Sequence, residues 1–266
     1  MDIQGKRVLL TGATGGIGQA IARELKQQGA ILLISARQEA ALKALADELG
    51  GAEYIVADMA RDEDLKKLLA SAGHVDILIA NAGLPGTDEI TAYSWPEIDS
   101  CLDVNLRAPI LLAQGLMPSM VERGEGHLLF ISSVAGKVAS PLSALYSASK
   151  FGLRGFADCL RMDLHGTGVG VSTIYPGMIS DAGMYAASGA SVPPGAPTNT
   201  TQDVAKAVSK AIIRNRASID VTGLVIKFGI HLAHFSPGLN GALQRLAGAR
   251  AAAKEFADGH RNKKGL

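Results

Sequence analysis

Tyr146 and Lys150 are a pair of residues whose types and spacing could support proton transfer. They stand in the run YSASK, and residues four positions apart on a helix share one face. A tyrosine hydroxyl has an ordinary pKa of about 10, and a fixed ammonium group nearby lowers that pKa by stabilising the phenolate. Such a pair can act as a general acid and base near neutral pH, although the same spacing also arises by chance on exposed helices.

The glycine-rich run TGATGGIG at residues 11–18 is a second candidate site. It lies between a short apolar run and a helical pattern, where glycines let the backbone approach a pyrophosphate and helix N-terminal amides point at it. Such turns also form only to pack a helix on a sheet, so the run alone leaves both functions open. It has two possible spacings, TGxxxGxG through Gly12, Gly16 and Gly18, or TGxxGxxG through Gly12, Gly15 and Gly18.

The end of the second apolar run indicates which dinucleotide would bind. An acidic residue about 20 positions past the glycines would hold the free ribose hydroxyl of NAD. This neighbourhood has Ala36 and Arg37 instead. An arginine can pair with a 2′-phosphate, so NADP is favoured and NAD is disfavoured. The alternative is a solvated arginine at the start of a helix.

Short apolar runs alternate with longer amphipathic segments, as in βαβ units around a parallel sheet. Strands are expected at 8–10, 31–35, 54–56, 77–80, 128–132, 171–175 and near 219–221. Because these runs are nearly all apolar, helices should cover both faces of the sheet. Helices are expected at 17–28, 39–49, 63–71, 95–122, 146–164 and 202–215, with a kink or break in the long one, which contains Pro109. The predicted fold class is α/β, a Rossmann-like doubly wound parallel sheet.

Polar and turn residues follow several of the predicted strands. Ligands bind beyond the carboxyl ends of the strands in such a sheet. Ser133 closes the fifth strand, where it could hydrogen-bond a substrate oxygen, while residues 81–83 follow the fourth and 176–177 the sixth. The segment 181–200 is rich in Gly, Ala, Ser and Pro and is expected to form a lid. We expect a site at this edge.

Composition argues against several other classes of protein. The net charge of +1 and charged fraction of 19% do not fit a nucleic-acid-binding protein. Cys101 and Cys159 are far apart and are expected to be reduced, buried thiols in a cytoplasmic protein. No secretion signal is visible at the N-terminus. The apolar stretch 221–235 is too short to span a membrane, which leaves peripheral membrane contact open.

Seven motifs occur in order along the chain. They are TGATGGIG, Asp58 after the third strand, NAG at 81–83, Asn105, ISS at 131–133, YSASK at 146–150 and YPG at 175–177. Together they resemble the short-chain dehydrogenase/reductase family in its compact single-domain branch, over about residues 5–221. The extended branch, with the TGxxGxxG spacing, has a longer C-terminal substrate domain than this chain could form, so the TGxxxGxG spacing is favoured.

The resemblance implies hydride transfer between the nicotinamide of NADP and a carbonyl or secondary alcohol carbon. Tyr146 would donate a proton to the carbonyl oxygen, Ser133 would polarise that oxygen, and Lys150 would bind the nicotinamide ribose and lower the tyrosine pKa. Asn105 would anchor a water that passes protons to Lys150. The implied cofactor-binding residues are Gly12, Thr14, Gly15, Gly16, Ile17, Gly18, Arg37, Asp58, Met59, Asn81, Ala82, Gly83, Tyr146, Lys150, Pro176, Gly177 and Ile179.

The sequence departs from this family in two places. Asp181 stands where the family often has threonine, and it is expected to face solvent or to cap the lid helix. After a domain at 1–222, the chain continues through a helical extension, 223–266, with helices predicted at 224–235 and 239–257.

One stripe of the first extension helix should pack on the domain or on a partner subunit. Membrane contact, or a pocket wall for a lipid-like substrate, are the alternatives. The extension also contains His231 and His234, which we expect at the surface or at an interface, and we expect no metal site. The residues of the stripe are Leu224, Val225, Phe228, Leu232 and Phe235.

An NADP-dependent carbonyl reductase or alcohol dehydrogenase, acting as a homo-oligomer, dimer or tetramer, is the leading hypothesis for function. One alternative is a 3-oxoacyl thioester reductase, which would need a basic patch for a carrier protein. Another is a non-catalytic NADP-binding redox sensor, a class that usually lacks the tyrosine and lysine. Candidates for the basic patch are Arg107, Arg154 and Arg161. An apolar substrate is suggested by Val134, Gly136, Leu142, Met178 and Met184.

Overall fold

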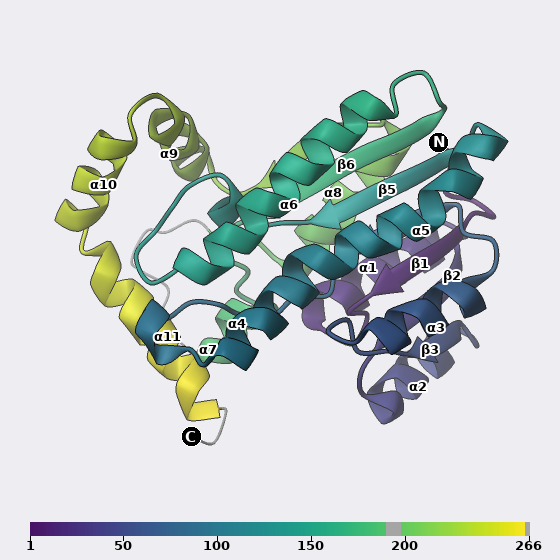
Figure 1. The fold of residues 1–266 in the computed structure, drawn as a ribbon, viewed down its shortest axis with the longest axis horizontal. Coiled ribbons are helices and arrows are strands. Elements are labelled where there is room, and N and C mark those ends of the chain that lie inside the picture. The colour runs from purple at the N-terminus through teal and green to yellow at the C-terminus, as the bar shows by residue number, and fades with distance from the viewer. Residues whose placement is uncertain (190–197, 264–266) are drawn as a thin grey trace.

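The computed structural model describes residues 1–189 and 198–263, and its centre is a seven-stranded parallel sheet (Figure 1). The strand order is β3-β2-β1-β4-β5-β6-β7. The order reverses between β1 and β4, which is where ligands bind in doubly wound sheets. This confirms the predicted fold class. The strands are β1 (Arg7–Thr11), β2 (Ile31–Ala36), β3 (Glu53–Val56), β4 (Ile77–Ala80), β5 (Gly126–Ile131), β6 (Val169–Pro176) and β7 (Ser218–Val221).

Helices cover both faces of the sheet because the strands are apolar on both sides. In β1, Leu10 packs into one hydrophobic cluster and Leu9 into the other, since neighbouring strand residues point to opposite faces. The first cluster includes residues of α1 (Gly16–Gln27), α2 (Glu39–Glu48) and α8 (Thr201–Ile213). The second includes residues of α3 (Asp62–Ala72), α5 (Ala108–Arg123) and α6 (Ala144–Asp163).

The long helix predicted at 95–122 is interrupted. It consists of α4 (Trp95–Leu102), a π-helical turn (Asp103–Arg107) and α5. The interruption lies immediately before Pro109. A proline has no N–H to donate to the carbonyl four residues earlier, here that of Asn105, and π-helical turns inside α-helices are frequent at functional sites.

The extension contains three helices where two were predicted. They are α9 (Leu224–Phe235), α10 (Pro237–Leu246) and α11 (Ala249–Lys263). The single helix predicted at 239–257 is wrong because the chain turns at Gly248, whose φ is +67°, a conformation that favours glycine. In Figure 1 the extension forms an arm beyond the sheet that returns to α7 (Gly183–Ser188). The central part of the predicted lid, 190–197, lies outside the described residues.

Two predictions of burial can be compared with the structure. The stripe of α9 does not pack on its own domain, because Leu224, Phe228 and Phe235 are 83%, 71% and 88% exposed, which leaves a partner subunit or a membrane to cover it. Among the side chains of α9 that the structure describes, Ile230 is the buried one, and it lies on the opposite side of the helix. Cys159 is exposed and only Cys101 is buried. Across the described ranges, the structure contains no helix that is both long and apolar enough to cross a bilayer.

His127 on β5 is a buried histidine remote from the glycine turn. Its Nε2 atom lies 2.9 Å from the Ser172 hydroxyl on β6. Burial, assisted by the positive charges of the N-terminus and Arg161, lowers the pKa of His127 from 6.5 to about 3. The folded chain therefore excludes a proton that the unfolded chain binds below pH 6.5, and stability falls as the pH falls from 6.5 towards 3.

Replacing His127 with Gln should make the free energy of unfolding less sensitive to acid. Each pH unit below 6.5 costs the native protein roughly 1.4 kcal/mol through this residue, and glutamine does not titrate. Urea unfolding of both proteins between pH 7.5 and 4.5 measures the two slopes. The exposed His165 provides the control variant His165→Gln, which makes the same substitution at the surface. Equal slopes for His127→Gln and wild type would contradict this assignment.

Candidate active site

The glycine turn connects the end of β1 to the start of α1, and its packing selects one of the two possible spacings. A Cβ atom at Gly12 would lie 2.7 Å from the Cα of Ala82, and one at Gly18 would lie 2.2 Å from the Gly12 carbonyl oxygen. At Gly16 it would lie 2.3 Å from the Cβ of Ala182. At Gly15 the nearest atom is 3.5 Å away. Packing thus requires glycine at the three positions of TGxxxGxG.

Thr11 and Asn81 hold this turn against the end of β4. The Asn81 amide nitrogen donates to the carbonyl oxygens of Thr11 and Gly12 at 3.1 Å. The Thr11 hydroxyl accepts from the backbone of Asn81 at 3.1 Å and of Ala82 at 3.2 Å. No acidic residue stands in the first turn of α1, so the positive end of that helix faces the turn uncompensated.

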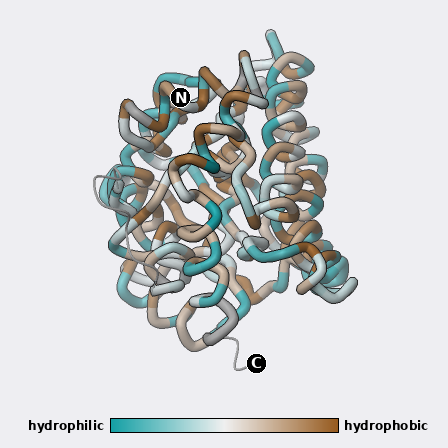
Figure 2. The backbone as a smooth tube through the Cα atoms, turned by 90° about the vertical axis from the view of Figure 1, so that its left-hand side faces the viewer, coloured by the Kyte–Doolittle hydropathy of each residue, from teal (hydrophilic) through white to brown (hydrophobic). Residues whose placement is uncertain are grey.

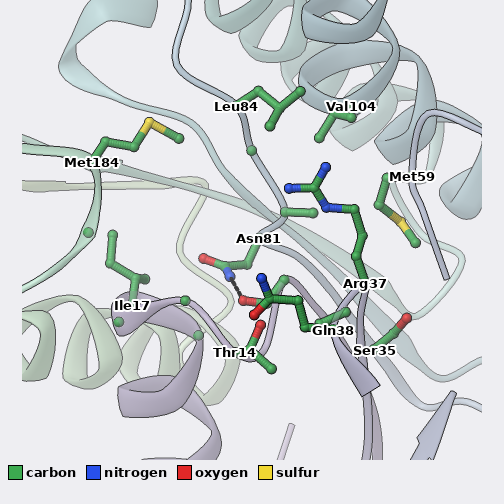
Figure 3. Close-up of a pocket in the computed structure, with 18 of the residues that line it drawn as sticks. Thr14, Ile17, Ser35, Arg37, Gln38, Met59, Asn81, Leu84, Val104 and Met184 are labelled. Carbon is green, nitrogen blue, oxygen red and sulfur yellow. Dashed lines mark hydrogen bonds between the residues drawn. The ribbon is translucent and has the colours of Figure 1, made fainter. Parts of the chain in front are cut away.

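A cleft of about 580 Å³ opens above this turn, which is within the range of small-molecule sites. Figure 3 shows Arg37 extending from the end of β2 beside Met59. The cleft is lined by these residues of the predicted set: Gly12, Thr14, Gly15, Gly16, Ile17, Gly18, Arg37, Asp58, Met59, Asn81, Ala82 and Gly83. It does not include Tyr146, Lys150, Pro176, Gly177 and Ile179.

Several cleft residues were missed from the sequence. Gln38 follows Arg37 at the end of β2 and could have been found from that position. Val104 comes from the π-helical turn, while Gly183 belongs to α7. Local sequence carries no signal for these two, because they reach the cleft only through the tertiary arrangement. Met184, which was expected to line an apolar pocket, lies in the cleft wall.

Ser133 and Tyr146 meet beyond the end of β5. Ser133 precedes the 3-10 turn Val134–Gly136, and its hydroxyl accepts from the Ala135 amide at 3.2 Å. The same hydroxyl forms a hydrogen bond with Tyr146. Tyr146 lies in the first turn of α6 and its backbone N–H donates to the Gly86 carbonyl at 3.2 Å. The two predicted hydroxyl groups are therefore adjacent at the carboxyl edge of the sheet.

Lys150 lies one helical turn after Tyr146 and is only 3% exposed. Its ammonium nitrogen donates to the Ile131 carbonyl at 3.0 Å and lies 5.6 Å from the centre of the Tyr146 ring. Burial lowers the pKa of Lys150 to about 8, because a charged ammonium group is disfavoured away from water.

The pKa of Tyr146 is not lowered overall in this structure, contrary to the expectation from its neighbour Lys150. Burial raises the pKa of the half-buried Tyr146 to about 12, against the smaller lowering effect of the Ser133 hydrogen bond. The ammonium is directed at the Ile131 carbonyl, so desolvation outweighs its attraction for a phenolate. Tyr146 is therefore protonated at neutral pH, which is the form that can donate a proton.

The Asn105 side chain ties the loop after β4 to α6. Its oxygen accepts from the Leu84 amide at 2.8 Å, and its nitrogen donates to the Leu84 carbonyl at 3.0 Å and to the Ser149 hydroxyl at 3.2 Å. Pro109 provides no N–H for the Asn105 backbone carbonyl. A water held by Asn105 would accordingly bind to that carbonyl rather than to the side chain.

Asp181 is exposed, which is one of its two predicted placements, and it does not cap the lid helix, whose N-cap is Ala182. Its carboxylate accepts from the Thr201 amide at 2.9 and 3.1 Å and from the Thr201 hydroxyl at 2.8 Å, so it joins the start of the lid segment to the first turn of α8. Gly177 donates to the Val221 carbonyl at 3.0 Å. Ile179 is 4% exposed and belongs to the hydrophobic core.

A parallel sheet with a glycine-rich turn at its switch point, beside a serine, tyrosine and lysine at the neighbouring strand ends, defines a Rossmann-type oxidoreductase that uses a nicotinamide dinucleotide. The sequence profile described as short chain dehydrogenase matches residues 6–192. The chain therefore belongs to this family, whose members act on CH–OH and C=O groups.

Similar proteins include two curated relatives and one solved structure. Ketoacyl reductase HetN of Nostoc sp. is 38% identical over 218 residues, covering 79% of this chain and 76% of its own. Dehydrogenase/reductase SDR family member 7B of Danio rerio is 31% identical over 259 residues, covering 90% and 84%. A variant of actinorhodin polyketide ketoreductase, solved with NADPH, is 28% identical with a TM-score of 0.75, covering 82% and 96%.

The crowding of the glycine turn yields a test with a matched pair of variants. Gly16→Ala should lower the free energy of unfolding by about 1–3 kcal/mol, because its Cβ atom would lie 2.3 Å from the Cβ atom of Ala182. Gly15→Ala should leave unfolding nearly unchanged, since its Cβ atom has space. Thermal unfolding of the two variants measures the difference. A greater loss for Gly15→Ala would contradict the TGxxxGxG assignment.

Proposed function

We propose that the chain is an NADPH-dependent reductase that transfers hydride to the carbonyl carbon of an apolar substrate, or in reverse from a secondary alcohol. The observation that carries this proposal is the hydrogen bond between Ser133 and Tyr146 with the buried Lys150 ammonium one helical turn away. These groups stand at the strand ends next to the nucleotide cleft, where a substrate oxygen could contact both hydroxyl groups.

The cleft fits a dinucleotide by the chemistry of its lining. The open backbone at Gly15 and the acid-free N-terminus of α1 suit a pyrophosphate. The glycine turn would hold the phosphates and Arg37 would hold a 2′-phosphate, with Asp58 and Asn81 nearby. A bound nicotinamide would supply the hydride.

Side chains of the protein would carry out the proton transfer to the substrate oxygen. Ser133 would donate a hydrogen bond to the substrate oxygen, which increases the positive character of the carbonyl carbon. Tyr146 would give its proton to that oxygen as negative charge develops there. Lys150, with a pKa of about 8, is mostly protonated at neutral pH and would stabilise the phenolate that remains. Burial makes this electrostatic stabilisation stronger than it would be in water.

The preference for NADP over NAD rests on Arg37. The residue is exposed at the cleft, and in the parts of the chain that the structure covers no carboxylate forms an ion pair with it. Its guanidinium is thus available for a phosphate. The polyketide ketoreductase of similar fold was solved with NADPH, which supports the same choice.

The apolar character of the substrate is supported by the residues around the site. Met184 lines the cleft, and Leu142 lies in the loop before α6 with a φ of +57°. Strained non-glycine residues of this kind cluster at ligand sites. Gly136 has no room for a side chain, since a Cβ atom there would lie 2.7 Å from the Lys150 carbonyl oxygen.

Reduction of 3-oxoacyl thioesters is a second candidate, favoured by the similarity to ketoacyl reductase HetN. The predicted carrier-binding arginines give it little support. Arg107 pairs with Asp62 at 2.5 Å, Arg154 lies 3.5 Å from Asp158, and Arg161 bonds Asn215. These contacts engage all three cations within the chain. A redox sensor is disfavoured because the proton-transfer groups remain together.

Tyr146→Phe tests the proposed activity. Loss of the acid should lower kcat by about 10²–10⁴-fold, while NADPH binding, followed by fluorescence titration, stays nearly unchanged. Turnover is measured as NADPH oxidation with aldehydes, ketones and 3-oxoacyl thioesters, and the thioester results separate the two candidates. Tyr54→Phe, at an exposed tyrosine, is the control. Full activity of Tyr146→Phe, or no turnover by wild type of any substrate despite bound NADPH, would refute the proposal.

Arg37→Ala tests the cofactor preference. Removing a hydrogen bond to a charged group costs about 1.5–3 kcal/mol, so the Kd for NADPH should rise by roughly 10-fold or more while that for NADH changes little. Titration of both cofactors measures this. Arg61→Ala removes an exposed arginine outside the cleft lining and should change neither value. Equal losses for the two cofactors would show that Arg37 does not contact a 2′-phosphate.

A further inference from the structure

The outer side of α9 and α10 exposes large apolar side chains, and we call it the α9–α10 surface. The residues that define it are Leu224, Phe228, Phe235, Leu239, Leu243 and Leu246, which are 83%, 71%, 88%, 48%, 44% and 85% exposed. Figure 2 shows the molecule from the side that carries the extension, and brown hydrophobic segments are visible in this view. Large exposed apolar side chains gathered on neighbouring helices in this way are typical of interaction sites.

Charge in this part of the chain has one sign. Residues 221–254 contain no Asp or Glu, although the whole chain has 25 of them among 266 residues. The cations in the stretch are Lys227, Arg245, Arg250 and Lys254. Arg250 pairs with Glu89 at 2.8 Å, while Arg245 and Lys254 are exposed. Apolar side chains flanked only by cations are typical of helices that lie in the interface of an anionic membrane.

A second copy of the chain is a poorer partner for this surface. In a symmetric dimer the same patch contacts itself, so the cations Lys227 and Arg245 would enter an interface in which residues 221–254 of either copy supply no carboxylate to pair with them. A bilayer with anionic headgroups provides both the apolar environment and the opposite charge. With 12 and 10 residues, α9 and α10 are too short to span it, so they would lie on its surface.

The extension also borders the side of the sheet where substrate would bind. It begins directly after the carboxyl end of β7, which pairs with β6 at Pro176. Gln244 on α10 donates to the Ala139 carbonyl at 2.8 Å, in the loop between Ser133 and Tyr146. Arg250 on α11 reaches Glu89, in the loop after β4. The α9–α10 surface and the candidate active site thus share this end of the molecule.

We propose that the α9–α10 surface docks the enzyme peripherally on an anionic lipid bilayer. The leucine and phenylalanine side chains enter the boundary between headgroups and acyl chains, and Lys227 and Arg245 contact the headgroup charges. An apolar carbonyl substrate dissolved in the bilayer then lies near the opening of the site. The docking does not depend on the proposed activity and is measured without it.

Sedimentation of the full chain with vesicles tests the docking. Wild type should bind vesicles of phosphatidylcholine and phosphatidylglycerol in equal parts, but not phosphatidylcholine alone, and salt should weaken the binding. Each cation near an anionic surface contributes about fivefold in affinity, so Lys227→Glu with Arg245→Glu should reduce binding at least tenfold. Phe228→Ser with Phe235→Ser should do the same through lost apolar area.

Matched controls use exposed residues elsewhere. Met162→Ser removes an apolar side chain that is 69% exposed on α6, and Lys43→Glu with Lys66→Glu reverses two exposed cations on α2 and α3. All should bind as wild type does. NADPH oxidation with a water-soluble substrate should be unchanged in every variant, so a lost docking surface is distinguishable from a lost enzyme.

Fluorescence gives a second readout because Trp95 is the only tryptophan in the chain. In a Trp95→Phe background, the emission of Phe228→Trp should shift to the blue on adding anionic vesicles, whereas Met162→Trp should not shift. The proposal would be overturned if wild type failed to bind anionic vesicles, or if both double variants bound them as strongly as wild type does. Concentration-dependent dimerisation that Phe228→Ser abolishes, without vesicle binding, would show that a second copy covers the surface instead.

Discussion

The buried ammonium group of Lys150 is the constraint on which the candidate site depends. An unpaired charge away from water is costly, and this one is held by the Ile131 carbonyl at the end of β5. That bond fixes the first turns of α6 against the strand end where Ser133 lies. Since Tyr146 stands one turn earlier on the same helix, its hydroxyl is brought to Ser133. The positions of Ser133 and Tyr146 relative to each other therefore depend on the hydrogen bond between the Lys150 ammonium group and the Ile131 carbonyl.

A hydrogen-bond network extends this constraint to the nucleotide cleft. Ser149 donates to the Tyr146 carbonyl at 2.7 Å and accepts from Asn105, and Asn105 holds both backbone groups of Leu84. Leu84 lines the cleft. The loop after β4 is thus fixed between the cleft on one side and α6 on the other. The π-helical turn brings Asn105 into this position by interrupting what would otherwise be one long helix.

Sequence predicted those parts of the site that depend on local spacing. The glycine run, Arg37 and the serine, tyrosine and lysine set could be found because strand ends and helix turns fix where such residues lie. The direction of the Tyr146 pKa shift could not, because burial of its hydroxyl depends on distant segments. The partner of Asp181 could not be predicted for a similar reason, since Thr201 lies twenty residues on, beyond the predicted lid.

The extension illustrates what periodicity can and cannot predict. The spacing of Leu224, Phe228 and Phe235 correctly put them on one face of a helix, yet a hydrophobic stripe does not show what covers it. Here Ile230 faces the protein and the stripe faces outward. The extension also makes contacts that sequence does not show, such as the stacking of Phe256 of α11 on Tyr185 of α7, with ring centres 5.5 Å apart.

These contacts connect the extension to α7, which forms part of the cleft wall. Gly259 of α11 lies so close to α7 that a Cβ atom would be 2.0 Å from the Ser188 carbonyl oxygen. On α7, Tyr185 contacts α11 while the neighbouring Met184 lines the cleft. Because α7 has only 6 residues and no hydrophobic core of its own, its position depends on its contacts with α11. The same three-helix arm that presents an apolar, cationic surface outward therefore also supports the residue that borders the nucleotide cleft.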